Sequence, residues 1–322
     1  MNAHVPRWRF VQRAVRRFMP GTSVESALQE AAALQARGIG TLLTCLGENV
    51  TRREEAEAVC SHYLAVIDSI ASRRLDAHVS VKPTHLGLDL SPPRAADLLL
   101  CLAQAAGRHG QLVWIDMEQS RYVDATLSVF RAVHARADNV GVCVQSYLRR
   151  TPADLDVLRP FAPHIRLVKG AYREPAAIAF PRKRDVDRAY EDLARRLIAD
   201  AGHNGAVVGI GTHDDRLIDR MAARAREAGL PAGVCEFEML YGINRRAQDR
   251  LARDGHRVRV LISYGDHWFP WYVRRLAERP ANILFVLKSL FRQGLRSPDG
   301  AWRPAGPPDE PGPGRRPPLA LE

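Results

Sequence analysis

The stretch 141-GVCVQSYLRRTPADLDVLRPFAPHIRLVKG-170 contains the repeat that decides the fold. Its two apolar runs, 141–145 and 165–169, stand on either side of a helical pattern near 151–159. A strand, a helix and a second strand in this order form a βαβ unit, in which the two strands run parallel. The same alternation extends in both directions along the chain, so we expect the whole domain to be built from such units.

Eight short apolar runs predict strands, and helical patterns separate them. The expected strands cover 39–45, 78–82, 112–116, 141–145, 165–169, 207–212, 233–239 and 258–264, and the expected helices lie near 51–73, 92–108, 121–136, 151–159, 184–201, 214–228 and 244–254. Eight such units in one domain indicate an α/β fold of the (βα)₈ barrel type. An open, doubly wound sheet is the alternative, but the chain lacks the GxGxxG turn that is typical of that fold.

The predicted barrel covers residues 38–294 and has a segment on either side. Residues 1–37 are expected to form an N-terminal helical region, in which 21–38 opens with a Ser/Thr cap. Residues 1–17 mix five arginines with apolar residues, which fits either a basic helix on an anionic membrane or a helix packed against the domain. Residues 295–322 are rich in proline and glycine, which predicts a disordered tail.

The composition limits the compartment and the partners. A net charge of +11 and a pI near 9.9 favour an anionic partner, but charge alone does not choose between nucleic acid, a membrane surface and a small anionic substrate. The five cysteines form no CxxC pair, which suits reduced thiols in the cytoplasm rather than a disulfide frame or a metal site. We find neither a signal peptide nor an apolar run long enough to span a membrane, so we expect a cytoplasmic or peripheral protein.

Polar residues gather at the predicted strand ends. They are Glu48, Lys82, Asp116, Gln145, Arg166, Lys169, Tyr172, Thr212, His213, Asp214, Glu236, Glu238 and Tyr264. Alone, each has a structural explanation, such as a solvated lysine, a helix cap or a paired carboxylate. Together they converge on one mouth of a parallel barrel, where enzymes of this fold carry their active sites. Three of them, Lys82, Arg166 and Lys169, are cations, so we expect the mouth to bind an anionic ligand.

A further cationic group lies in 269-FPWYVRRLAERPAN-282, which we expect to be a short helix. On a helical wheel, Glu278 falls between Arg274 and Arg275 on the face opposite the apolar stripe. Taken alone, this pattern is typical of a solvated ion-pair face. Its position after the eighth strand instead favours a short helix that lies across the barrel mouth.

The chain resembles monofunctional bacterial proline dehydrogenases. The motifs that carry the resemblance are 38-GIGTLLTCLGE-48, 79-VSVK-82, 115-IDME-118, 144-VQSYLRR-150, 166-RLVKGAY-172, 212-THD-214, 236-EFEMLYG-242 and 269-FPWYVRRLAERPAN-282. The resemblance implies a distorted (βα)₈ barrel with the last helix over its mouth. It also implies non-covalent FAD, oxidation of L-proline to Δ1-pyrroline-5-carboxylate and electron transfer to a membrane quinone, with no nucleic-acid partner. A coupled aldehyde dehydrogenase domain is not expected.

The resemblance also implies roles for the residues around the substrate. Lys82, Arg274 and Arg275 would hold the substrate carboxylate, which suits planar guanidinium groups and a lysine charge. Glu278 would orient the two arginines. Glu48 would act as a gate by pairing with Arg274 when no substrate is present.

A second set of residues would line the ring pocket and the cofactor site. The ring pocket would be formed by Asp116, Tyr172, Leu240 and Leu261. The residues toward FAD would be Gln145, Arg166, Lys169, Gly170, Ala171, Thr212, His213 and Glu236. Among these, Arg166 would stabilise the negative charge of the reduced flavin.

Three positions depart from the family pattern and leave alternatives open. Leu261 stands where a tyrosine usually covers the substrate ring, Pro83 replaces a leucine and Glu238 replaces a glutamine. Family members that prefer hydroxyproline also lack the tyrosine, so a dehydrogenase for hydroxyproline or another cyclic imino acid is the first alternative. A leucine adds no hydroxyl partner, which keeps proline first. A Schiff-base aldolase using Lys169 or Lys82, and an inactive barrel that serves in binding, are further alternatives.

Overall fold

The computed structural model describes residues 18–231 and 233–266, in which eight parallel strands close into a barrel in the order of the sequence. The strands are β1 (Gly40–Cys45), β2 (Ala77–Val81), β3 (Val113–Ile115), β4 (Val140–Gln145), β5 (His164–Val168), β6 (Val208–Gly211), β7 (Cys235–Leu240) and β8 (Arg257–Tyr264). Strand β1 pairs with both β2 and β8, which closes the barrel. The predicted (βα)₈ fold is confirmed.

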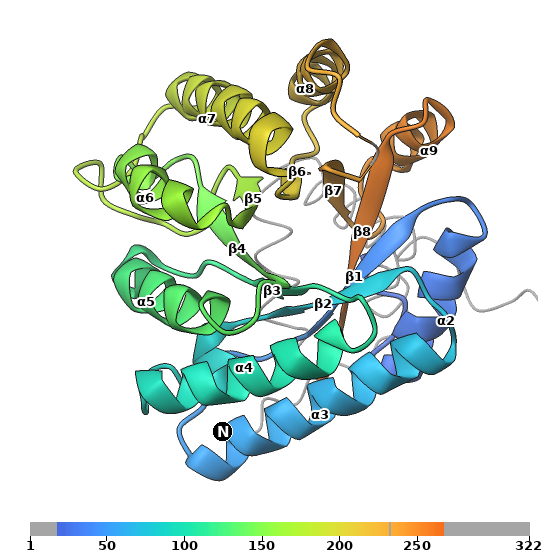
Figure 1. The fold of residues 1–322 in the computed structure, drawn as a ribbon, viewed down its shortest axis with the longest axis vertical. Helices are drawn as coiled ribbons and strands as arrows, with labels where there is room; N and C mark the ends of the chain where they lie inside the picture. The colour runs from blue at the N-terminus through green and yellow to red at the C-terminus, as the bar shows by residue number, and fades with distance from the viewer. Residues whose placement is uncertain (1–17, 232, 267–322) are drawn as a thin grey trace, which may run out of the picture. The chain divides into compact units, whose positions relative to one another are not determined.

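Helices connect the successive strands and lie around the barrel (Figure 1). They are α2 (Val24–Gln35), α3 (Arg53–Ser72), α4 (Pro92–Gly107), α5 (Val123–His134), α6 (Thr151–Leu158), α7 (Lys183–Asn204), α8 (Asp215–Glu227) and α9 (Arg245–Arg253), with short 3₁₀ turns η1 (Pro83–Leu86), η2 (Ser120–Tyr122) and η3 (Arg159–Phe161). Each connecting helix expected from the sequence is present. Within this part of the chain, no helix is long and apolar enough to cross a membrane.

Several sequence predictions lie outside the described residues. They concern the basic segment 1–17, the short helix in 269–282 with Arg274, Arg275 and Glu278, and the tail at 295–322. The domain boundaries at 38 and 294 stay predictions.

The strands alternate between two environments, as their period of two residues requires. On β2, Val79 and Val81 belong to the hydrophobic core, whereas Ser80 bonds to side chains from β3 and β5 across the barrel interior. Helix starts are fixed by local caps. The Ser91 hydroxyl accepts a hydrogen bond from the Arg94 N–H, and the Asp214 carboxylate accepts one from the Arg216 N–H.

Buried ion pairs fill the barrel interior near the amino ends of the strands. We call Asp76, Glu236, Arg257 and Arg259 the amino-end cluster. The Arg259 Nε donates to both Glu236 carboxylate oxygens at 3.0 and 2.8 Å, and its Nη1 donates to Asp76 at 3.0 Å. Arg257 donates to the same Asp76 oxygen at 2.6 Å. Both charges of the Glu236–Arg259 pair are therefore compensated inside the barrel.

A tyrosine from α3 enters the seam between β1 and β2. The Tyr63 hydroxyl accepts a hydrogen bond from the Cys45 N–H at 2.9 Å and donates one to the Ser80 carbonyl at 3.0 Å. The β1–β2 register ends just before this point, at Leu43 and Val79. The hydroxyl thus replaces a direct strand-to-strand bond where the barrel widens toward its mouth.

Candidate active site

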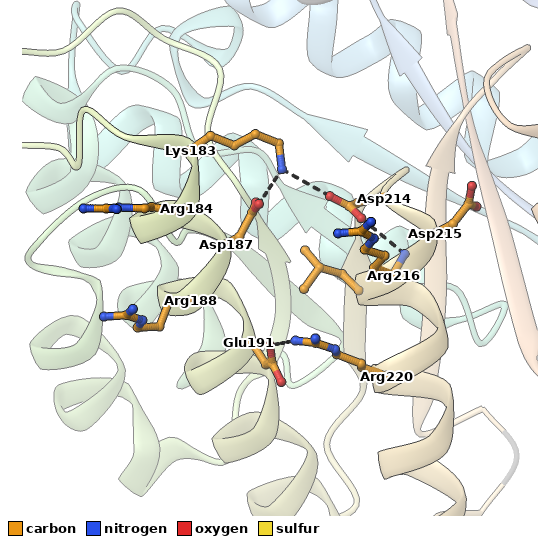
Figure 2. A pocket seen from close by; sticks show the side chains of 10 residues that line it. Lys183, Arg184, Asp187, Arg188, Glu191, Asp214, Asp215, Arg216 and Arg220 are labelled. Carbon is orange, nitrogen blue, oxygen red and sulfur yellow. Dashed lines mark hydrogen bonds and ion pairs between the residues drawn. The ribbon is translucent and has the colours of Figure 1, made fainter.

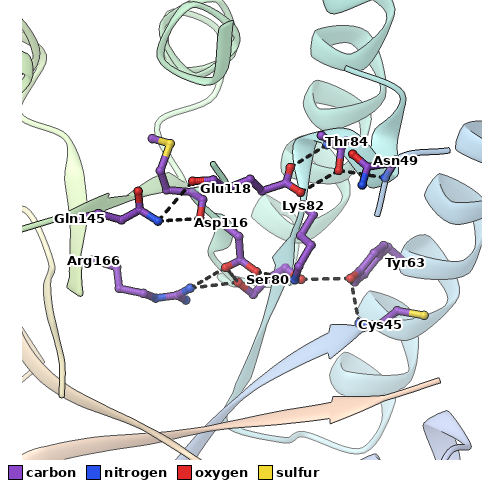
Figure 3. Close-up of polar contacts among 11 residues, drawn as sticks. Cys45, Asn49, Tyr63, Ser80, Lys82, Thr84, Asp116, Glu118, Gln145 and Arg166 are labelled. Atoms are coloured by element: carbon purple, nitrogen blue, oxygen red, sulfur yellow. Dashed lines mark hydrogen bonds and ion pairs between the residues drawn. The ribbon is translucent and has the colours of Figure 1, made fainter. Parts of the chain in front are cut away.

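Five polar residues form a connected group inside the barrel toward the carboxyl ends of the strands. Figure 3 shows four of them, Ser80, Lys82, Asp116 and Arg166. We call Ser80, Lys82, Asp116, Arg166 and Glu238 the mouth cluster. The Lys82 Nζ lies 3.1 Å from Asp116 Oδ2, and the Arg166 Nη1 lies 3.0 Å from Asp116 Oδ1. The Ser80 hydroxyl donates to Asp116 at 2.7 Å and accepts from Arg166 at 3.0 Å. One carboxylate therefore holds the two predicted cationic residues together.

The Asp116 carboxylate stays ionised in this position. Burial opposes its ionisation, but the positive charges of Lys82 and Arg166 hold the pKa of Asp116 below its usual value. The predicted grouping of Lys82, Asp116 and Arg166 at one mouth is what the structure shows.

Arg166 has a second carboxylate on its other side. Its Nε lies 2.6 Å from Glu238 Oε2, and both side chains are almost fully buried, with 6% and 4% of their surface exposed. The guanidinium also stacks over the ring of Trp114 at 4.7 Å from the ring centre. Arg166 is therefore fixed by Asp116, Glu238 and Trp114 together.

A glycine makes the Arg166–Glu238 contact possible. Gly209 on β6 lies between Arg166 on β5 and Glu236 on β7 in the strand register. A Cβ atom at Gly209 would come within 2.2 Å of Glu238 Oε1, closer than atoms can approach. The missing side chain leaves the space in which the two side chains meet across β6.

A second set of hydrogen bonds involves Thr84, Glu118 and Gln145, which lie at or just after the carboxyl ends of β2, β3 and β4. The Glu118 carboxylate accepts from the Thr84 N–H at 3.0 Å and from the Thr84 hydroxyl at 2.7 Å. The Gln145 amide donates to the carbonyls of Met117 and Glu118 at 3.3 Å. Burial raises the pKa of Glu118 although both bonds from Thr84 oppose this. Gln145 is thus oriented by the backbone that follows Asp116.

The β1–α3 loop is tied to the same set. The Asn49 N–H donates to the Thr84 hydroxyl at 3.1 Å, and Asn49 has a left-handed φ of 55°. Glu48, the predicted gate, stands just before it and is half-buried. Its predicted partner Arg274 lies outside the described residues.

Lys169 belongs to a different group of charges. Its Nζ lies 2.6 Å from Asp187 and 3.1 Å from Asp214, and Lys183 pairs with the same two carboxylates. Gly170 has a φ of 105° and lies against the Tyr147 ring, while Ala171 is exposed. The structure places Lys169 beside the starts of α7 and α8.

A cleft of about 680 Å³ opens between the first turns of α7 and α8 (Figure 2). It is lined by Lys183, Arg184, Asp187, Arg188, Glu191, Asp214, Asp215, Arg216, Leu217 and Arg220. Two helix amino termini and five basic side chains line this space together with four carboxylates, so the helix termini and the small excess of positive charge favour an anionic group.

Two further predicted cofactor residues, Thr212 and His213, follow directly after β6. The His213 ring accepts a hydrogen bond from the Leu240 N–H at 2.9 Å, and the Thr212 hydroxyl accepts one from the Asp214 N–H at 3.2 Å. Leu240 is paired in register with Leu261 on β8. Both leucines are half-buried, so they form an apolar strip at the mouth.

Tyr172, predicted for the ring pocket, is half-buried in the segment between β5 and α7.

Glu236 does not join the other predicted cofactor residues. It lies in the amino-end cluster, where Arg259 occupies both of its oxygens. Two residues along a strand correspond to about 7 Å, so Glu236 and Glu238 face the same interior at different depths. This placement argues against the predicted contact between Glu236 and FAD.

The sequence interpretation left out Ser80, and it placed Glu238 at a strand end without giving it a role in the site. Ser80 and Glu238 carry the bonds around Arg166. The signal for both was the period of two: Ser80 precedes Lys82 by two positions, and Glu238 precedes Leu240 by two. Each therefore shares a strand face with a residue that was predicted.

A closed parallel barrel with charged side chains gathered toward the carboxyl ends of its strands defines this chain as a barrel of the enzyme type. The family model for proline dehydrogenase matches residues 27–288. Proline dehydrogenase 1 of Bacillus subtilis subsp. natto is 37% identical over 278 residues, which cover 86% of this chain and 91% of the relative. Proline dehydrogenase of Deinococcus radiodurans is 36% identical over 282 residues, with 86% and 89% covered. The chain belongs to the proline dehydrogenase family.

The fold also resembles that of a solved structure. Proline utilization A from Bdellovibrio bacteriovorus, inactivated by N-propargylglycine, matches with a TM-score of 0.76 and 23% sequence identity. The match covers 83% of this chain and 32% of that protein, so the chain spans about a third of its length. At this identity the likeness concerns the fold.

Proposed function

We propose that the protein oxidises L-proline to Δ1-pyrroline-5-carboxylate with a non-covalently bound FAD and passes the electrons to a membrane quinone. Membership of the proline dehydrogenase family supports the substrate and the class of oxidoreductase. The observation that carries the proposal is a pair of unsatisfied polar atoms at the mouth, on residues predicted to face the flavin.

These atoms belong to Arg166 and Gln145. The Arg166 Nη2 and the Gln145 Oε1 are buried and have no hydrogen-bond partner within residues 18–231 and 233–266. Buried polar atoms are rarely left unpaired, and a missing ligand is a common reason when they are. A donor and an acceptor at the mouth fit the mixed acceptors and donors along the polar edge of a flavin ring.

The cleft between α7 and α8 suits the other end of the cofactor. A dinucleotide carries a diphosphate, and helix amino termini with basic side chains are the usual partners of such a group. Arg184, Arg188 and Arg216 line this cleft, next to Lys169 and His213. The residues present therefore fit FAD, and Thr212, Gly170 and Ala171, which are neighbours of His213 and Lys169 in the sequence, would contact the cofactor between its two ends.

The substrate would bind where the mouth cluster meets the apolar strip. The Lys82 ammonium would hold the proline carboxylate, and Asp116 fixes the position of that ammonium. Leu240, Leu261 and Tyr172 would enclose the ring. Arg274 and Arg275, oriented by Glu278, would complete the carboxylate site, with Glu48 as the gate.

When bound, FAD supplies the acceptor for the hydride that leaves the ring carbon next to nitrogen. The residues of the chain fix the orientation of the substrate and need to move no proton for this step, provided that the amine arrives deprotonated. The buried positive charge of Arg166 would stabilise the negative charge that the transfer creates. Transfer to a quinone needs access to a membrane surface, which the net charge of +11 favours.

An absorbance experiment tests the proposal. Purified protein loaded with FAD should show the visible band of oxidised flavin, and anaerobic L-proline should bleach it. A Lys82→Met variant should keep FAD but need far more proline for bleaching, because the carboxylate loses a charged partner. Glu57→Gln, which removes an exposed charge on α3, serves as the matched control. Protein that takes up no flavin, or bound flavin that proline leaves oxidised, would contradict the proposal.

The alternative substrate is hydroxyproline, and the apolar strip of Leu240 and Leu261 makes it the less favourable one. A ring hydroxyl placed against Leu240 and Leu261 would lose its bonds to water and gain none from these side chains. We therefore expect a larger kcat/KM for proline than for hydroxyproline. The opposite order would assign the protein to hydroxyproline.

A further inference from the structure

Glu238 is a buried carboxylate that the proposed reaction does not use. We infer that Glu238 is a positioning residue that sets the effective charge of Arg166 and thereby couples reduction of the bound flavin to uptake of a solvent proton at Glu238. This inference rests on the proposed function, because it requires flavin beside Arg166.

The first support is the contact itself. Glu238 Oε2 lies 2.6 Å from Arg166 Nε, while Asp116 and Ser80 bind the Nη1 of the same guanidinium at 3.0 Å. With Glu238 ionised, the two cations Lys82 and Arg166 face two carboxylates, and the mouth cluster is neutral. With Glu238 protonated, the cluster carries one positive charge. The state of one oxygen therefore decides the field that a ligand meets at this mouth.

The second support is the poor solvation of the Glu238 carboxylate. Its Oε1 faces the backbone at Gly209 and has no hydrogen-bond partner in the described part of the chain. Ionised carboxylates in proteins normally have several donors, so a half-satisfied one is costly and protonation relieves the cost.

The groups around Glu238 act in both directions. Arg166 on β5 and Arg259 on β8 favour the ionised form, whereas burial and the neighbouring Glu236 on β7 oppose it. Cys143 on β4 and Tyr190 on α7 also lie within electrostatic reach. Asp116, directly after β3, shares Arg166 with Glu238 and thereby limits the attraction that Arg166 can offer. Burial prevails and raises the pKa of Glu238 to about 7.

The sign of the effect follows from these charges. Above about pH 7, Glu238 is ionised and offsets Arg166, so Arg166 stabilises the reduced flavin less. Below that pH, Glu238 is neutral and Arg166 acts with its full charge. Because reduction adds negative charge nearby, it favours the protonated carboxylate. The two electrons come from the substrate, the proton comes from solvent, and the bond that forms at Glu238 is its O–H bond.

The test compares the midpoint potential of bound FAD in the wild type, Glu238→Gln and the control Glu57→Gln, from about pH 5.5 to about pH 8.5. Glutamine keeps the shape and removes the charge. We expect the potential of Glu238→Gln to lie above that of the wild type at high pH and to meet it at low pH, while the control follows the wild type throughout. Potentials of Glu238→Gln and wild type that differ by a constant, or not at all, would overturn the inference.

A measurement on the wild type alone covers the possibility that Glu238→Gln does not fold. When an electrode supplies the two electrons at about pH 8, the proton uptake followed with a pH indicator should exceed the one proton that two-electron reduction of flavin to its anionic form requires. Uptake of one proton overturns the inference while leaving the proposed function intact. Protein that binds no flavin overturns both.

Discussion

The hydroxyl of Tyr63 bridges β1 and β2 near the barrel mouth, and its removal tests how much this bridge contributes to stability. It bridges the Cys45 N–H and the Ser80 carbonyl at 2.9 and 3.0 Å, and the tyrosine is fully buried. Tyr63→Phe removes both bonds and leaves two backbone groups without partners. Each such loss costs about 1 to 3 kcal/mol, so we expect the free energy of unfolding to fall by about 2 to 6 kcal/mol.

The assay is urea unfolding, followed by circular dichroism, with thermal unfolding as a second readout. For a chain of 322 residues the loss corresponds to a fall in Tm of about 3 to 12 °C. Ser80 also bonds to Asp116 and Arg166, so the KM for proline should rise in the folded variant. This second effect would link the seam between β1 and β2 to the mouth cluster.

Tyr190→Phe is the matched control. Tyr190 is equally buried, but its hydroxyl makes a single bond, to the Leu167 carbonyl at 3.2 Å. We expect that variant to lose about 1 kcal/mol and to keep its KM. Equal losses of stability in the two variants would refute the bridging role assigned to Tyr63.

Three further predictions concern other parts of the chain. Arg275→Ala should raise the KM for proline by orders of magnitude while FAD stays bound, as steady-state kinetics and flavin absorbance would show. Glu236→Gln should cost about 3 to 5 kcal/mol in urea unfolding, because Arg259 is left without its buried partner, yet the folded variant should bind FAD as tightly as the wild type. Burial lowers the pKa of His78 and His164 in the folded state, so the unfolded chain binds more protons than the folded chain below about pH 6.5. The free energy of unfolding should therefore fall as the pH drops from there, and asparagine at both positions should reduce this loss in urea titrations.

The strands and connecting helices could be predicted because each is short and bounded by clear signals. Residues 141–145 were expected to form a strand and form β4 over Val140–Gln145, and the helix expected at 92–108 begins at Pro92 after the Ser91 cap. Apolar runs and caps are local features, so one sequence suffices to locate them.

The candidate site could be predicted only in part, because depth along a strand is not a local feature. Lys82 and Asp116 follow directly after β2 and β3 and could be assigned to the mouth. Glu236 was expected there too, but the register of β7 against β8 places it beside Arg257, at the other end. The role of Tyr63 was equally hidden, since it depends on a gap between β1 and β2, the strands on either side of α3, and the sequence pattern does not show where their pairing ends.

The two clusters of buried charge in the barrel differ in a way that separates structure from function. In the amino-end cluster, Arg259 and Glu236 use each other's polar atoms, and such a closed network rigidifies the fold. In the mouth cluster, Arg166 Nε, Arg166 Nη2 and Glu238 Oε1 are buried without hydrogen bonds, although Arg166 Nε forms an ion pair with Glu238. No other buried Lys, Arg, Asp or Glu side-chain atom in residues 18–231 and 233–266 shares this condition. A buried polar atom without a hydrogen bond is costly, and a missing ligand is one explanation for it. The charged groups at the amino ends of the strands therefore satisfy one another, whereas those at the carboxyl ends leave polar atoms without hydrogen bonds, at the place where a ligand would supply them.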